Sequence, residues 1–310
     1  MEDMITNYKM LMREAAARGP KKFAVIEPHE RASIKAINDA RKKGMAEGIL
    51  IGQARLIESL LKSLKIPASH FDIRNEDDDA SAAECGVRLA AAGDVDIILK
   101  GSVSTGVLLS AALRGVPNLR TGNILCDVLI FEDKRNGRRC VTLVSDGSVN
   151  IAPDLKAKLG IIRNAVMVAH ALGIKVPKVA ILSSVEKVQP EIQSSVDAAA
   201  LAKICSFGEI PGCTVDGPFA LDNAISAKSA KIKKVESPVA GAADILIAPN
   251  LEAGNMFCKG LIYYGGKDLA HAVVGAKVPI LTSSRSDPPS AILASIAFGV
   301  VLSASKKWPA

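Results

Sequence analysis

The feature of this sequence that most constrains its fold is the regular alternation of short apolar segments with longer amphipathic ones. The short segments predict buried strands, and the longer ones predict helices. Strands separated by helices of this length favour parallel pairing with right-handed crossovers, so we expect an α/β fold. The predicted strands lie at 22–26, 48–51, 71–73, 95–99, 178–182, 213–215, 244–248, 272–274 and 278–281.

One segment departs from the alternation. Two apolar runs, 124–131 and 139–144, flank the dipeptide Asn136-Gly137, which is typical of an antiparallel hairpin. A hairpin of this kind often marks a passage between domains, and 310 residues exceed what one hydrophobic core usually organises. We therefore predict one α/β domain over residues 1–150, completed by the C-terminal 284–310, and a second over 151–283.

Charge and composition narrow the class of partner. The formal net charge is +7, but Lys and Arg are spread along the chain without a dense basic block. This pattern favours a small anionic ligand over nucleic acid. The longest apolar stretch, 291–301, is too short to cross a bilayer, and residues 1–18 lack the apolar stretch of a signal peptide. We expect a cytoplasmic protein with no membrane or nucleic-acid partner.

The cysteines and histidines do not predict a metal site. The chain has six cysteines and four histidines, with no C-x-x-C pair and no spacing typical of metal ligands. We expect reduced and mostly buried thiols, and no bound metal.

The strongest candidate for chemistry follows the last predicted strand, 278–281. There the chain runs into Ser284, Arg285 and Asp287 before an apolar helix over 290–303. The carboxyl end of a strand is where an open α/β sheet binds its ligands. Arg285 offers a planar set of donors for a phosphate, and Ser284 and Asp287 are suited to proton transfer. A solvated loop that ends in a helix cap remains an alternative.

A second candidate follows the strand at 95–99. Lys100, Ser102 and Thr105 belong to a turn rich in Gly and hydroxyl groups that leads into a helix. Such a turn presents backbone N–H groups and a helix N-terminus to an anion. The turn lacks both the P-loop ending and the G-x-G-x-x-G spacing, so it predicts neither a nucleoside triphosphate nor a dinucleotide. A plain turn with capping hydroxyls is the alternative.

Polar residues also follow most of the other predicted strands, whereas the connections from helix to strand are mostly Gly, Pro and Lys. This asymmetry is typical of a crevice built from strand-to-helix loops. Capping preferences before helices explain part of it. We expect further members of the site to be Arg120, Asn150, Asp216, Asn250, Glu252 and Asn255.

The chain as a whole resembles the phosphate acyltransferases, the family of phosphotransacetylase and phosphotransbutyrylase. The resemblance rests on five segments in the right order along nearly the whole chain. They are Lys100-Gly-Ser-Val-Ser-Thr105, Leu119-Arg-Thr-Gly122, Val215-Asp-Gly-Pro-Phe-Ala-Leu-Asp222, Ala243-Asp-Ile-Leu-Ile-Ala-Pro-Asn-Leu-Glu-Ala-Gly-Asn255 and Ser284-Arg285.

The resemblance implies two three-layer α/β domains that flank a cleft, in a fold shared with isocitrate and isopropylmalate dehydrogenases. It also implies a homodimer or higher homo-oligomer. The implied reaction is the reversible transfer of a short acyl group between coenzyme A and inorganic phosphate. Coenzyme A is then a substrate, and no tightly bound cofactor is expected. The first and second segments favour the butyryl-type branch over the acetyl-type branch.

The resemblance also implies roles for single residues. Ser284 and Arg285 would face the cleft, and Asp287 would accept the thiol proton. In the acetyl-type branch the corresponding acid lies further along, where this chain has Ala291 and apolar neighbours. We expect Arg285, with Arg120 or Lys100, to bind the phosphoryl group.

Proton transfer to Asp287 has an energetic limit. The pKa of a thiol is about 8.5 and that of an aspartate about 3.9, so full transfer would cost roughly 6 kcal/mol. Transfer must therefore accompany attack on the acyl carbon, or the environment must bring the two pKa values together. For Asp216, Asn250 and Glu252 we expect scaffolding of the loops that line the cleft.

Two other classes of function remain open at this stage. A decarboxylating dehydrogenase on the same fold would need a carboxylate cluster for a divalent metal and a nucleotide-binding loop, and neither is well formed in the sequence. A binding module would hold acyl-coenzyme A or acyl phosphate without converting it.

Overall fold

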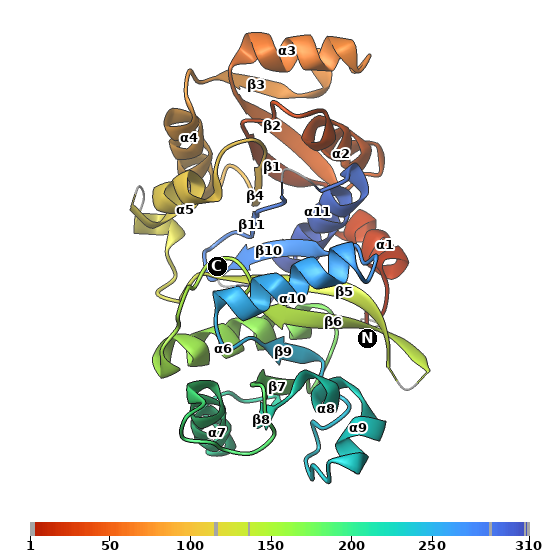
Figure 1. Cartoon of the computed structure of the whole chain (residues 1–310). Helices are drawn as coiled ribbons and strands as arrows, with labels where there is room; N and C mark the ends of the chain where they lie inside the picture. The colour runs from red at the N-terminus through yellow and green to blue at the C-terminus, as the bar shows by residue number, and fades with distance from the viewer. Residues whose placement is uncertain (1–3, 115–116, 136, 285–286, 307, 309–310) are drawn as a thin grey trace. The chain divides into compact units, whose positions relative to one another are not determined.

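A computed structural model describes residues 4–114, 117–135, 137–284, 287–306 and 308. The chain divides into two compact units, each formed by segments that are distant in the sequence. Unit 1 comprises Met1–Tyr8 and Ile124–Leu269, and unit 2 comprises Lys9–Asn123 and Ala270–Ala310. Both units alternate strands and helices (Figure 1), so the predicted α/β class is confirmed.

Unit 2 contains a sheet in the order β3-β2-β1-β4-β11-β10. Strands β1, β2, β3, β4 and β11 pair in parallel, whereas β10 and β11 are antiparallel, which the sequence did not indicate. The strands are β1 Lys21–Ile26, β2 Ala46–Gly52, β3 Asp72–Asn75, β4 Ile97–Lys100, β10 Ala270–Val274 and β11 Ile280–Leu281. The helices are α1 Tyr8–Arg18, α2 Arg31–Lys42, α3 Ala54–Ser63, α4 Asp79–Ala92, α5 Thr105–Arg114 and α11 Pro289–Ser303, with short 3₁₀ turns at Ala68–His70 and Pro117–Leu119.

Helices cover both faces of this sheet. Helix α4 packs on β1, β2, β4 and α5, and α11 packs on α2, β4, β10 and β11 on the other face (Figure 1). Helix α2 buries Ile34 and Ile37, one turn apart, which is the pattern of an amphipathic helix. Helix α11 is apolar all round and buries residues on every side, because it lies between α2 and the sheet.

Unit 1 contains a sheet in the order β5-β6-β9-β7-β8. Its strands are β5 Cys126–Arg135, β6 Arg138–Ser145, β7 Lys178–Leu182, β8 Thr214–Phe219 and β9 Ile245–Ile247. Strands β5 and β6 form the predicted antiparallel hairpin, and the other pairs are parallel. Its helices are α6 Leu155–Ala171, α7 Gln193–Ser206, α8 Leu221–Ile225, α9 Ala227–Ile232 and α10 Leu251–Tyr263.

The core of unit 1 joins one face of the sheet to helices α8 and α10. Phe131, Phe219 and Leu246 are buried there, together with Ala224 of α8 and Cys258 of α10. These side chains come from segments up to 127 residues apart in the chain, from Phe131 to Cys258. The short helix α8, which the sequence did not indicate, completes this core.

The two domains expected from the sequence, 1–150 with 284–310 and 151–283, stay a prediction. By packing, the units change at 8/9, at 123/124 and at 269/270. The reason is strand pairing, because β6 pairs with β9 and this brings the whole hairpin into unit 1. Strand β10 pairs with β11, which brings residues from 270 onward into unit 2.

Three site candidates lie in elements other than those expected. Asp216 was placed after a strand, but β8 continues to Phe219 and contains it. Glu252 and Asn255 were placed in a loop, but α10 begins at Leu251 and contains both. Pairing with β7 extends β8 through Asp216, whereas the Asn250 cap starts α10 before Glu252.

Substitution of two glycines of α10 would test how closely this helix packs. A Cβ at Gly254 would lie 2.3 Å from the backbone oxygen of Asp146, whereas nothing lies within 4 Å of one at Gly260. We expect Gly254→Ala to lower the free energy of unfolding by about 1–3 kcal/mol. Gly260→Ala should raise it by up to about 1 kcal/mol, because alanine favours a helix. Urea unfolding of both variants checks this, and equal effects would contradict the close approach.

Candidate functional site

The carboxyl ends of three neighbouring strands form the edge of unit 2 that carries the strongest candidates. Strand β4 lies between β1 and β11, with Ile26 paired to Lys100 and Leu99 paired to Leu281. Neighbouring strands are about 5 Å apart. The loops that follow β1, β4 and β11 therefore lie side by side, which brings together the Lys100–Thr105 turn and the segment that contains Ser284.

The turn after β4 is held by the end of β1. The N–H of Gly101 donates to Ile26 O at 2.8 Å. The N–H and the hydroxyl of Ser102 both donate to Glu27 O, at 2.7 and 3.0 Å. Ser104 Oγ accepts from Val107 N, so it caps α5. The donors at Gly101 and Ser102 are thus used within the protein, and the first turn of α5, from Thr105, keeps N–H groups that suit an anion.

The Lys100 side chain points into its own turn. It is only 4% exposed, and its ammonium group donates to Gly101 O and Val103 O at 3.0 and 3.3 Å. In this arrangement Lys100 stabilises the carbonyls of the turn. Its role as a phosphate ligand stays a prediction.

Ser284 and Asp287 form a closed turn. The N–H of Ser284 donates to Asp287 Oδ2 at 2.8 Å, and the N–H of Asp287 donates to Ser284 O at 3.0 Å. Pro288 is the N-cap residue of α11 and makes no side-chain cap. The Asp287 carboxylate therefore orders this turn and does not cap the helix. Arg285 lies outside the described residues.

Arg120 belongs to a loop that is held by the segment after β10. It forms an isolated bridge with Ala276, and the Thr121 hydroxyl donates to Gly275 O at 2.6 Å. The Arg120 side chain is exposed. It is thus available to an anion, in the same unit as Lys100 and Ser284.

Glu27 and His29 are the site residues that the sequence analysis did not select. Glu27 is 2% exposed, and its Oε2 lies 2.7 Å from Nδ1 of His29. Burial, together with Asp79 and Asp78, raises the pKa of Glu27 to about 7. Burial lowers the pKa of His29. Perturbed groups of this kind cluster at functional sites. The signal in the sequence was Glu27-Pro28-His29 directly after a buried strand.

In unit 1 the loop after β6 is organised by a buried carboxylate. Asp146 accepts hydrogen bonds from the N–H groups of Ser148, Val149 and Asn150 and from the Asn150 amide. Burial and the neighbouring Asp127 raise the pKa of Asp146 above its usual value. The Asn150 amide also donates to Leu125 O, so both of its N–H donors are used. Only its carbonyl oxygen remains suited to a ligand.

The loop after β9 lies beside this one, because Ser145 pairs with Ile247. Asn250 caps α10 by accepting from Ala253 N, and Asn255 donates to Gly147 O at 3.1 Å. Glu252 is exposed in the first turn of the helix. Asp216 accepts from the N–H of Gly217 in β8, two strands away from β9. Unit 1 thus brings Asn150, Asn250 and Asn255 together and leaves Asp216 apart.

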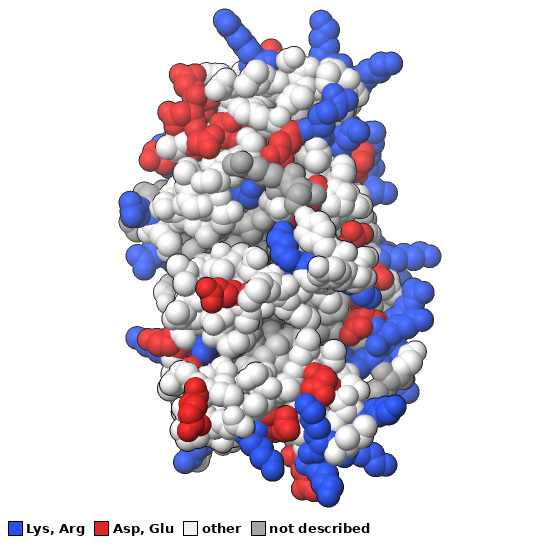
Figure 2. Space-filling model, in the orientation of Figure 1, with Lys and Arg blue, Asp and Glu red and all other residues white. Residues whose placement is uncertain are grey.

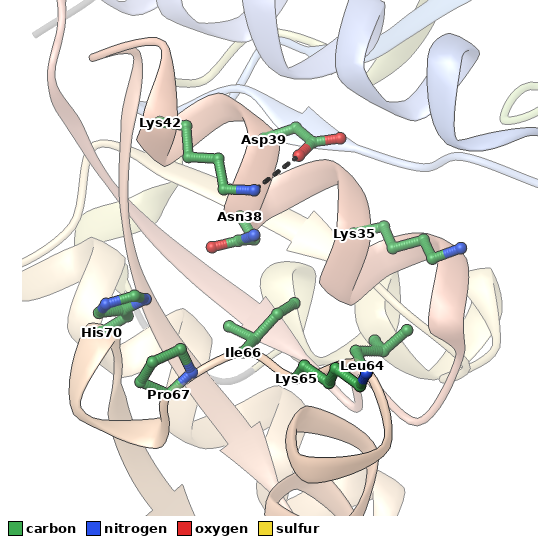
Figure 3. Close-up of a pocket in the computed structure, with 9 residues that line it drawn as sticks. All are labelled: Lys35, Asn38, Asp39, Lys42, Leu64, Lys65, Ile66, Pro67 and His70. Carbon is green, nitrogen blue, oxygen red and sulfur yellow. Dashed lines mark ion pairs between the residues drawn. The ribbon is translucent and has the colours of Figure 1, made fainter.

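Two surface pockets lie in unit 2, and one of them is beside the candidate edge. One, of about 480 Å³, lies between α4 and α5 beside the Lys100–Thr105 turn and is lined by Ala80, Glu84, Gly106, Val107, Ser110, Ala111 and Arg114. The other, of about 430 Å³, lies between α2 and the segment that leads to β3. Figure 3 shows its lysines and the Lys42–Asp39 ion pair. This second pocket lies away from the carboxyl ends of the strands.

The described part of the chain adds two negative findings. It contains no group of three His, Cys, Asp or Glu side chains that could hold a metal ion. None of its helices is long and apolar enough to cross a membrane. All six cysteines are free, and Cys85, Cys126 and Cys258 are buried.

Comparison with known proteins identifies the family. The profile of the family described as "Phosphate acetyl/butaryl transferase" matches residues 80–300. A phosphate butyryltransferase of Clostridium beijerinckii is 37% identical over 98% of this chain and 100% of its own length. A phosphate acetyltransferase of Rhizobium meliloti is 34% identical over 97% of this chain and 95% of its own. The chain belongs to the phosphate acetyl/butyryl transferase family.

A solved structure agrees with this assignment. The branched-chain phosphotransacylase of Enterococcus faecalis superposes with a TM-score of 0.79 at 28% identity, over 91% of this chain and 98% of that one. The predicted resemblance to the phosphate acyltransferases is therefore confirmed, and so is the prediction of an acyltransferase enzyme. In this acyltransferase, the family match covers the Lys100–Thr105 turn, Arg120 and the Ser284–Asp287 turn.

Gly101 tests the importance of the turn for the acyltransferase. A Cβ at this position would lie 2.2 Å from Glu27 O, so alanine must displace either the turn or the end of β1. We expect Gly101→Ala to lower kcat/KM at least tenfold in an acyl-transfer assay, because small displacements of positioning groups are costly. Gly260→Ala, which meets no atom within 4 Å, is the control and should retain activity. Full activity of Gly101→Ala would show that the turn is not part of the site.

Proposed function

We propose that this acyltransferase reversibly transfers a short acyl group between coenzyme A and inorganic phosphate, with the butyryl type favoured over acetyl. The likeness to the phosphate butyryltransferase of Clostridium beijerinckii, over 98% of this chain and 100% of that one, carries the proposal. A helix start suited to an anion, and the hydrogen bonds between Ser284 and Asp287 at the same sheet edge, support it. Coenzyme A is then a substrate, and no tightly bound cofactor is required.

In the proposed mechanism, a phosphate oxygen attacks the thioester carbonyl and the thiolate leaves. A ternary complex suffices, because positioning the reactants replaces a covalent enzyme intermediate. Arg285, with Arg120 or Lys100, binds the phosphate and offsets the charge that develops on the carbonyl oxygen. Ser284 donates a hydrogen bond to the tetrahedral intermediate. The exposed position of Arg120 supports its share in this role.

In the reverse direction the thiol of coenzyme A must lose a proton as it attacks the acyl phosphate. Asp287 is our candidate for the acceptor. Its Oδ2 is occupied by the N–H of Ser284, and Oδ1 accepts no hydrogen bond from the described residues. The turn therefore fixes the carboxylate and leaves one oxygen for the thiol.

The family and the fold support three further proposals, on the acyl-coenzyme A contacts, the oligomeric state and the polar residues of unit 1. The pocket between α4 and α5 offers Val107 and Ala111 as apolar contacts for part of the acyl-coenzyme A. We further propose a cytoplasmic homodimer or higher homo-oligomer. Asn150, Asp216, Asn250 and Asn255 would serve as scaffold residues of unit 1, which their hydrogen bonds within loops and helix starts support. Glu252, exposed in the first turn of α10, would have the same role.

Release of thiol from butyryl-coenzyme A on addition of phosphate tests the function. We expect phosphate-dependent release, and arsenate should also support it. In Arg285→Ala, kcat/KM should fall by about 10²-fold with weaker phosphate saturation, because a charged donor to the transition state is lost. Lys306→Ala is a matched loss of positive charge near the C-terminus and should retain activity. Binding of acyl-coenzyme A without thiol release would instead favour a binding module.

Asp287→Asn tests the proton acceptor. The amide has the shape of the carboxylate but cannot take up a proton, so turnover from acyl phosphate and coenzyme A should fall by about 10²-fold or more. Asp94→Asn, an exposed acid at the opposite end of β4, is the control. Unchanged turnover of Asp287→Asn would remove Asp287 from the mechanism.

A further inference from the structure

Glu27, the first residue after β1, has an unusual backbone as well as a buried side chain. Its φ is +51°, in the left-handed region that residues other than glycine rarely adopt. Such a conformation persists only where surrounding contacts hold it, and it is frequent at functional sites. Glu27 is also 2% exposed. Neither property is needed to end a strand, and the mechanism above does not use this residue.

The backbone of Glu27 connects three strands. Its N–H donates to Ile51 O of β2 at 2.8 Å, and its carbonyl accepts both donors of Ser102 after β4. Gly101 is packed so closely against this carbonyl that a Cβ would lie 2.2 Å away. The conformation of Glu27 therefore fixes where the Lys100–Thr105 turn begins.

The carboxyl group of Glu27 packs against Gly52, where a Cβ would come too close to it. Its Oε2 lies 2.7 Å from His29 Nδ1. Glu27 Oε1 and His29 Nε2 are buried and have no hydrogen-bond partner among the residues that the structure describes. Both face Gly52, where a Cβ would lie 2.8 Å from Oε1 and 3.2 Å from Nε2. The pair is thus packed in place, with hydrogen-bonding capacity left unused.

The charges around the pair are mainly negative. Asp78 and Asp79 lie at the start of α4, and Figure 2 shows acidic side chains gathered where Figure 1 places the connection from β3 to α4. Glu30 is the N-cap residue of α2, in the connection between β1 and that helix. The Lys100 ammonium group donates to the carbonyl of Gly101 in its own turn. Burial and these aspartates raise the pKa of Glu27 to about 7, so its carboxyl group loses its proton as the pH rises through that value.

We propose that Glu27, paired with His29, is a positioning residue whose proton controls the affinity of the Lys100–Thr105 turn for phosphate. The inference rests on the proposed function, which makes phosphate a substrate. With the proton bound, the Glu27 side chain is neutral, and its backbone carbonyl holds Ser102. Loss of the proton leaves a buried negative charge on the residue that anchors the turn, and this charge repels an anionic ligand. Phosphate affinity therefore falls as the pH rises through about 7.

Calorimetric titration of the whole protein with inorganic phosphate at pH 6 and pH 8 tests this proposal. Glu27→Gln keeps the shape and a hydrogen bond to His29 but cannot ionise. The ratio of Kd at pH 8 to Kd at pH 6 should be at least about threefold smaller in Glu27→Gln than in the wild type. The ionisation of phosphate itself affects both proteins equally, so it cancels in this comparison.

Two further variants complete the test. Glu30→Gln removes a neighbouring acid that makes no side-chain cap, and it should keep the wild-type ratio. Asp79→Asn removes the largest charge contribution to the pKa of Glu27, so the fall in affinity should move to lower pH. Asp79 is exposed, so this variant decides the question even if Glu27→Gln fails to fold. The proposal is overturned if neither variant alters the pH dependence.

The outcomes separate this proposal from the proposed function. If the wild type releases thiol but Glu27→Gln and Asp79→Asn keep its pH dependence of phosphate binding, the positioning role fails and the acyltransferase assignment stands. If no thiol is released but the variants alter phosphate binding as expected, the assignment of the reaction fails and the positioning role stands.

Discussion

The candidate site depends on one hydrogen-bonded contact, in which the carbonyl oxygen of Glu27 accepts both donors of Ser102. This contact joins the carboxyl ends of β1 and β4, and Glu27 has a left-handed backbone conformation there. It also explains the glycine at 101, since any side chain there would meet the same carbonyl. The first turn of α5 is oriented by these constraints, so an anion bound there would be positioned by β1 as much as by its own loop.

In unit 1 a strand-to-helix loop is also organised by one buried residue, here through its side-chain carboxylate. Its loop after β6 folds around the Asp146 carboxylate, which accepts three backbone N–H groups and the Asn150 amide. In both units a buried acid organises a strand-to-helix loop, and in both the pKa of that acid is raised. Desolvation disfavours the ionised acid, while hydrogen bonds to the carboxylate favour it at Asp146. At Glu27, Oε1 is buried and has no hydrogen-bond partner among the described residues.

Part of the candidate site was selected from the sequence, and the roles of its residues stay predictions. Ser284, Asp287, Lys100 and Ser102 were selected because polar residues follow apolar strands, and parallel pairing brings their loops to one edge. Glu27 follows the same rule but carries no recognisable motif, and its importance comes from burial and a positive φ that composition does not reveal. Lys100 was selected as a phosphate ligand because it is a cation beside a turn, yet its ammonium group bonds to the carbonyls of that turn.

The sequence alone determined the alternation of strands and helices, the β5–β6 hairpin and the family. These depend on local periodicity, turn chemistry and ordered motifs, all of which are contained in short segments. Only the tertiary structure decided that the units change at 124 and 270, that β8 continues through Asp216 and that β10 runs antiparallel to β11. Each of these depends on which strand pairs with which, and pairing is fixed by hydrogen bonds between segments far apart in the chain, for which the local pattern contains no signal.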